Sequence, residues 1–161
     1  MITDAKTDPT TLISTGSLSP SFECITSGGA EINIAEMRGK VIMLNFFAVW
    51  CPPCKLELPV LQKYVWEEYK DYEDFMLLVI GREHDSKVIE GFIAEKGYKM
   101  PFVPDPDRRI FDLFATQYIP RNVVIDRDGI IIFQNRSYSA KELKIIEDIL
   151  EEKLKNIKSE L

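Results

Sequence analysis

Apolar residues gather in short runs that alternate with turn-forming residues, a pattern typical of strands and helices in one mixed domain. The run Val41–Phe47 has the length and side chains of a buried strand, and Phe75–Gly81 is a second run of this kind. Two shorter segments flank Ser27-Gly28-Gly29, which is a hairpin turn signal. The predicted strands are Phe22–Thr26, Ala30–Ile34, Val41–Phe47, Phe75–Gly81, a short extended piece at Met100–Val103, Asn122–Ile125 and Ile130–Asn135.

Helices are predicted from apolar spacing and from capping residues. Leu58, Leu61 and Val65 recur at i, i+3 and i+7, which gives one apolar face of a helix from about Cys51 to Tyr69, bent at Pro59. Three further helices are predicted: one after Asp85 or Ser86 that ends at Gly97, a short one that begins at Asp105-Pro106 and runs through Phe114, and one opened by the capping box of Ser139 and Glu142. The order of elements predicts an α/β fold, a mixed β-sheet with helices on both faces and an N-terminal β-hairpin.

Length and charge narrow the function classes. A chain of 161 residues suits one domain, which we place at residues 16–161, and residues 1–15 are polar and predict a flexible N-terminal tail or linker. The net charge of −6 argues against nucleic-acid binding, which depends on Lys and Arg. No apolar run approaches the roughly 18–20 residues that span a membrane, and residues 1–10 lack the pattern of a signal peptide. The sequence fits a cytosolic protein or a trimmed form of an exported one.

The chemistry centres on Cys51 and Cys54, which lie where a predicted strand passes into a predicted helix. The first turn of a helix carries free N–H groups and the positive end of the helix dipole, so it favours a thiolate. Cys51 is therefore the candidate nucleophile and Cys54 the resolving cysteine. A structural zinc site needs about four ligands, and only Cys24 and the single histidine, His84, could add to this pair, neither at paired-ligand spacing. We expect Cys24 to be a small buried side chain, give His84 no role, and expect no cofactor beyond a redox-active Cys51–Cys54 disulfide.

The segment Phe-Phe-Ala-Val-Trp-Cys-Pro-Pro-Cys-Lys resembles the active-site segment of thioredoxin-fold proteins. The neighbouring residues resemble the TlpA/ResA-like thiol–disulfide oxidoreductases more closely than cytosolic thioredoxin. Asn45 stands where thioredoxins usually carry a buried Asp, Glu57 matches a glutamate of the TlpA/ResA group, and Pro59 matches the proline of the active-site helix. The similarity runs from about Gly16 to the last helix.

The resemblance implies roles for residues around the cysteines. Trp50, Pro52 and Pro53 would contact substrate, and Ile119-Pro120 occupies the place of a cis-proline loop whose Ile119 backbone binds an extended substrate segment. Glu57 has two interpretations: a proton relay for Cys54, or a solvated helix charge paired with Lys63 or another nearby base.

The function that the resemblance implies is disulfide exchange with protein substrates, as a reductant supplied by an upstream electron donor. The group mostly works outside the cytoplasm, often on protein disulfides that include those of apocytochromes c. We expect an extracytoplasmic monomer, with a cytoplasmic location as the alternative. A peroxiredoxin-like thiol peroxidase is disfavoured because Ala48 stands where that pattern needs Thr or Ser. A non-catalytic binding module is the other alternative.

Overall fold

The structure is a computed structural model that describes residues 8–156. Five strands form a central sheet in the order β5-β4-β3-β6-β7. The strands are β3 (Val41–Phe47), β4 (Phe75–Arg82), β5 (Phe102–Asp105), β6 (Arg121–Ile125) and β7 (Ile131–Asn135). Strands β3, β4 and β5 are parallel to one another, whereas β6 and β7 are antiparallel to their neighbours, so the predicted mixed sheet is confirmed.

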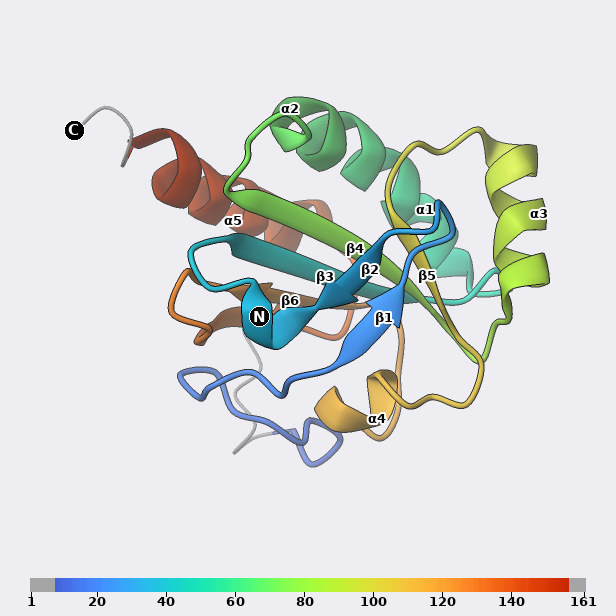
Figure 1. Ribbon diagram of the computed structural model, residues 1–161, viewed down its shortest axis with the longest axis horizontal. Coiled ribbons are helices and arrows are strands. Elements are labelled where there is room, and N and C mark those ends of the chain that lie inside the picture. The colour runs from blue at the N-terminus through green and yellow to red at the C-terminus, as the bar shows by residue number, and fades with distance from the viewer. Residues whose placement is uncertain (1–7, 157–161) are drawn as a thin grey trace.

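A separate hairpin precedes the sheet, as the turn signal predicted. Strands β1 (Glu23–Ile25) and β2 (Glu31–Asn33) pair antiparallel, and the short 3-10 helix η1 (Ile34–Glu36) follows them. The hairpin lies in front of the central sheet in Figure 1. Cys24 of the hairpin is buried and packs against the face of the central sheet that carries Leu44 of β3.

The two faces of the sheet are covered unequally. Met43 and Phe47 of β3 pack against α1 (Pro52–Leu61), α3 (Ser86–Lys96) and α5 (Ala140–Leu150). The alternate β3 residues, Ile42, Leu44 and Phe46, pack instead with the hairpin and with the single-turn helix α4 (Phe111–Phe114). Helices therefore lie on both faces of the sheet, but α1, α3 and α5 all lie on the face that carries the cysteines.

The helix after the cysteines is longer than α1 alone. It continues through the π-helical segment η2 (Gln62–Trp66) into α2 (Glu67–Tyr69), and α5 continues likewise into η3 (Glu151–Asn156). Pro59 lies inside α1, where it cannot donate a backbone hydrogen bond. Leu58, Leu61 and Val65 are fully buried, which confirms the apolar face read from their spacing.

The prediction of a flexible tail over residues 1–15 is wrong for the part that the structure describes; residues 1–7 lie outside it. Asp8 is 3% exposed and accepts hydrogen bonds from Thr10 and Thr11. The buried Arg121 guanidinium donates to the hydroxyls of Thr10 and Thr11 at 2.7 and 3.1 Å. The polar residues that led to the prediction of a tail include Thr10 and Thr11, whose hydroxyls accept hydrogen bonds from this buried cation.

The short helix predicted to begin at Asp105-Pro106 begins instead at Phe111. Asp105 ends β5, and its carboxylate accepts hydrogen bonds from the backbone N–H groups of Ile110 and Phe111 at 3.0 and 2.9 Å. Arg108 between them has a φ of +61°, a left-handed conformation that a helix cannot include. The prediction of Asp105 as the N-cap residue is therefore wrong, since the N-cap is Ile110, but the Asp105 carboxylate does bind the first N–H groups of the helix from outside it.

Candidate active site

Cys51 and Cys54 lie at the junction of β3 and α1, and a disulfide joins them. Cys51 is the N-cap residue, with Pro52 and Pro53 in the first turn of the helix. The backbone N–H of Cys54 points at the Cys51 sulfur, at 3.4 Å. Cys54 is fully buried and Cys51 is 3% exposed. This geometry gives the Cys51 sulfur the helix-end environment that favours a thiolate, and places Cys54 behind it.

A groove of about 460 Å³ opens at Cys51. The predicted substrate contacts Trp50, Pro52, Pro53 and Ile119 all line it. Trp50 is 59% exposed, so most of its ring is available to a partner. The remaining lining residues, which the sequence did not indicate, are Arg82, Arg108, Thr116, Gln117 and Tyr118.

The loop opposite Cys51 has the predicted conformation. The Ile119–Pro120 peptide bond is cis, and the Ile119 carbonyl oxygen lies 3.9 Å from the Cys51 sulfur. Pro120 is buried and, unlike Ile119 before it, is not among the residues that line the groove. Arg121, directly after it, donates to the carbonyl oxygens of Gln117 and Tyr118 and holds the loop from inside.

Glu57 is 2% exposed, so the interpretation as a solvated charge paired with Lys63 is wrong. One carboxyl oxygen accepts a hydrogen bond from the Asn45 side-chain amide at 2.6 Å, and the other accepts from that of Asn122 at 2.9 Å. Burial raises the pKa of Glu57 to about 7, although these two hydrogen bonds oppose the rise. The carboxyl can therefore take up or release a proton near neutral pH.

Three asparagines on adjacent strands form the surroundings of Glu57. Asn45 of β3 is paired with Asn122 of β6, which is paired with Asn135 of β7. The amide of Asn45 donates to Asn122 at 2.8 Å, and the side-chain oxygen of Asn135 accepts from the Asn122 backbone at 3.2 Å. Sequence reasoning missed Asn122 and Asn135. Asn is rare inside strands, and this rarity is the feature of the sequence that could have pointed to both residues. It becomes informative only once strand order and register are known.

His84, to which the sequence assigned no role, contacts the segment that leads into the cysteines. Its side chain is 6% exposed, and its Nε2 accepts a hydrogen bond from the backbone N–H of Val49 at 2.9 Å. Burial lowers the pKa of His84, which favours the neutral imidazole that this contact needs. His84 is thus a positioning residue for the start of the active-site loop.

The third cysteine lies apart from this pair. Cys24 is buried in the core on the hairpin side of the sheet, and burial raises the pKa of its thiol to about 11. Within residues 8–156, no cluster of three or more His, Cys, Asp or Glu side chains could hold a metal ion. In the same range, no helix combines the length and apolar character needed to cross a membrane.

Comparison with known proteins places this geometry among thiol-dependent proteins. The redoxin family pattern matches residues 14–150. The thiol-disulfide oxidoreductase ResA of Bacillus subtilis is 30% identical over 122 residues, a match that covers 74% of this chain and 66% of ResA. Among solved structures, a candidate protein disulfide isomerase of Bacteroides thetaiotaomicron is 33% identical with a TM-score of 0.86, over 91% of this chain and 93% of that one. StoA of Bacillus subtilis is 25% identical with a TM-score of 0.67, over 80% of this chain and 96% of that one.

Proposed function

The chain belongs to the redoxin family and, within it, to the TlpA/ResA-like thiol–disulfide oxidoreductases, and on this premise we propose that it reduces disulfides of protein substrates. The observation that supports this best is the Cys51–Cys54 pair at the N-terminus of α1, with Cys51 at an open groove and Cys54 enclosed. An attacking thiol has to meet a macromolecular disulfide, whereas a resolving thiol has to stay shielded from solvent until it is needed.

The reaction begins with both cysteines reduced. The Cys51 thiolate attacks one sulfur of the substrate disulfide, forms a mixed disulfide and releases the other substrate sulfur as a thiolate, which takes a proton from solvent. Cys54 then loses its proton and attacks the Cys51 sulfur. This step closes the Cys51–Cys54 disulfide and releases the second substrate thiolate, so two electrons have passed from the protein to the substrate. A dithiol protein upstream has to return them.

Glu57 is the group that we assign to the Cys54 proton. It lies three residues after Cys54 on α1 and therefore on the same side of the helix. A carboxyl with a pKa of about 7 is a competent base at neutral pH and a competent acid in the reverse direction. Asn45 and Asn122 are positioning residues that hold both carboxyl oxygens.

Substrate docking is assigned to the groove. The exposed Trp50 ring, Pro52 and Pro53 form one side of it, and the Ile119 backbone forms the other. The family resemblance supports a reductant that works outside the cytoplasm and needs no cofactor other than its own disulfide. We propose both for this protein.

Two measurements test the proposal. The first is the reduction potential of the Cys51–Cys54 pair, from equilibration with glutathione and dithiothreitol buffers. We expect a value well below about −200 mV, towards the roughly −270 mV of thioredoxin, and a value near about −120 mV would make the protein an oxidant instead. The second is a Cys54→Ser variant, which should stop at the mixed disulfide and accumulate a covalent complex with a protein disulfide such as that of insulin. A Cys51→Ser variant is the control and should form none. Failure of the wild-type pair to cycle in any buffer would favour the non-catalytic module.

A further inference from the structure

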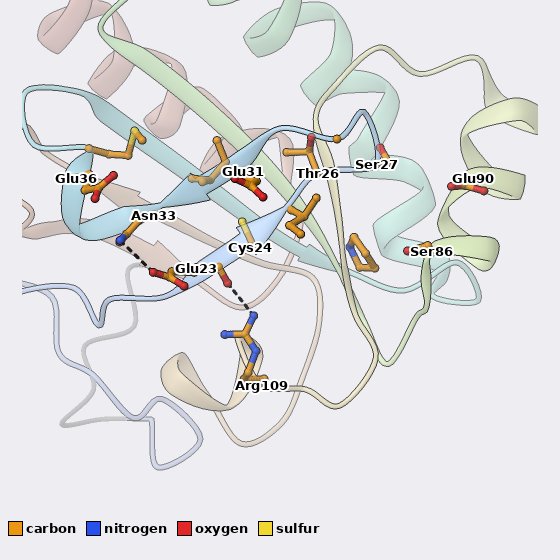
Figure 2. Close-up of a pocket in the computed structure, with 15 residues that line it drawn as sticks. Glu23, Cys24, Thr26, Ser27, Glu31, Asn33, Glu36, Ser86, Glu90 and Arg109 are labelled. Carbon is orange, nitrogen blue, oxygen red and sulfur yellow. Dashed lines mark hydrogen bonds between the residues drawn. The ribbon is translucent and has the colours of Figure 1, made fainter.

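The groove beside Cys51 carries positive charge in an acidic protein. The chain has a net charge of −6, yet the charged residues that line the groove are both arginines, Arg82 and Arg108. The larger cavity of about 900 Å³ beside the hairpin, drawn in Figure 2, has a different set of charged residues. That cavity is lined by four glutamates, Glu23, Glu31, Glu36 and Glu90, and its one arginine, Arg109, is engaged with the backbone oxygen of Glu23.

The two arginines of the groove differ in what they bind. Arg108 is fully used: its guanidinium donates to Glu83 at 3.2 Å, to Asp112 at 3.1 Å and to the carbonyl oxygen of Thr116 at 2.7 Å. The Arg82 guanidinium makes no hydrogen bond or ion pair with any residue between 8 and 156, although the carboxylates of Glu83 and Asp112 lie near enough to oppose the lowering of its pKa by burial. Its Nε is buried without a partner.

Arg82 is nevertheless held in place. Its guanidinium carbon lies 5.0 Å from the centre of the Phe111 ring, and that of Arg108 lies 5.1 Å from the centre of the same ring. Phe111 is fully buried, so both cations rest on a fixed support. Two like charges gather on one ring, and only Arg108 makes direct ion pairs, so the Arg82 guanidinium can still bind an arriving anion directly.

We propose that Arg82 is a specificity-determining residue that binds a carboxylate of the substrate protein, so that disulfides flanked by Asp or Glu are reduced in preference to others. This inference rests on the proposed function, because it names which substrates the Cys51 groove selects. A guanidinium presents paired donors that match the two oxygens of a carboxylate, and a held guanidinium loses less conformational freedom on binding than a mobile lysine. The buried Phe111 ring, on which both guanidinium groups lie, keeps Arg82 at the groove.

The test uses three disulfide-linked peptide homodimers that differ only in the residue after the cysteine, which is Glu, Gln or Lys. We measure the second-order rate constant for reduction of each by the reduced full-length protein, divided by its rate constant with dithiothreitol to remove intrinsic differences. The Glu peptide should react about fivefold faster than the Gln peptide, as expected for a partly exposed ion pair, and the Lys peptide should react slowest. The preference should shrink in 0.5 M salt, where charges are screened beyond about 4 Å.

Arg82→Gln should make the relative rate constants of the Glu, Gln and Lys peptides equal. The readout is the ratio between peptides, so a change in the overall rate of the variant does not affect it. The matched control is Arg38→Gln, which removes the same charge from an exposed arginine just before the opposite end of β3. Equal rates for the three peptides with the wild-type protein, or a preference that survives in Arg82→Gln, would overturn the inference and leave the proposed function intact. Reduction of none of the peptides would overturn the proposed function itself. If Arg82→Gln folds poorly, the rates of the three peptides with the wild-type protein, at low salt and in 0.5 M salt, still test whether the groove prefers a carboxylate.

Discussion

Replacement of Glu57 by glutamine should change how the stability of the oxidised protein depends on pH. The Glu57 carboxyl has a pKa of about 7 in the folded protein, against an ordinary value of 4.5. Between these values the folded state keeps a proton that the unfolded state has released, so the free energy of unfolding falls as pH rises through this window. At 1.36 kcal/mol per pKa unit, ionised Glu57 costs the folded wild-type protein about 3 kcal/mol above pH 7.

Glu57→Gln removes this pH dependence because glutamine does not ionise. Glutamine has one acceptor oxygen where the two amides of Asn45 and Asn122 need two, so we expect the variant to lose about 1 kcal/mol at pH 5. At pH 8 the variant should be more stable than the wild type by about 2 kcal/mol, since it is spared the buried charge. The two stability curves should therefore cross near pH 6.

The assay is equilibrium unfolding in urea at pH 5, 6, 7 and 8, with the disulfide intact so that the cysteines do not titrate. His84 also titrates in this range with the opposite sign, but it does so in both proteins and cancels in the difference. Glu90→Gln on the exposed side of α3 is the matched control and should follow the wild-type curve. Parallel curves for the wild type and Glu57→Gln would refute the reasoning. The kinetic counterpart is slower disulfide exchange with a flatter pH profile, and unchanged rates across pH would exclude Glu57 as the proton relay.

Two further predictions concern contacts outside the cysteine pair. Deletion of residues 1–15 removes the hydroxyls of Thr10 and Thr11 from the buried Arg121, which should lower the free energy of unfolding by about 2 kcal/mol in urea denaturation; a change within about 0.5 kcal/mol would mean that this segment is dispensable. His84→Leu leaves the Val49 N–H without its acceptor and should cost about 1–3 kcal/mol at pH 8. Because burial lowers the pKa of His84, the wild type loses stability as pH falls below 6.5, and the variant should not share that component of the loss.

The parts of the fold that the sequence predicted are those fixed by local pattern. The bounds of β3 coincide with the apolar run Val41–Phe47. Cys51 is the N-cap of the helix that the spacing of Leu58 and Leu61 predicted. Both features depend on residues a few positions apart. The two cysteines were found for the same reason, because their chemistry lies in one segment.

The parts that were missed depend on pairing between distant strands. Nothing near Asn122 in the sequence shows that it lies beside Asn45, 77 residues earlier, or that both hold Glu57. Asp105 was wrongly predicted as the N-cap residue, because the loop up to Phe111, with its left-handed Arg108, left no pattern in the sequence. Arg82 was invisible for a related reason: its significance is a lack of partners, which only the folded arrangement shows.

The central sheet separates the third thiol from the redox pair. Cys24 packs in the core on the hairpin side, whereas Cys51 and Cys54 belong to the core on the other side. A disulfide between Cys24 and either of them would have to pass through paired strands, so the folded protein cannot scramble its own cysteines. A Cys24–Cys51 or Cys24–Cys54 linkage within one monomeric molecule is consequently a record that this molecule had opened, and its abundance would serve as a covalent count of unfolding events during storage or turnover.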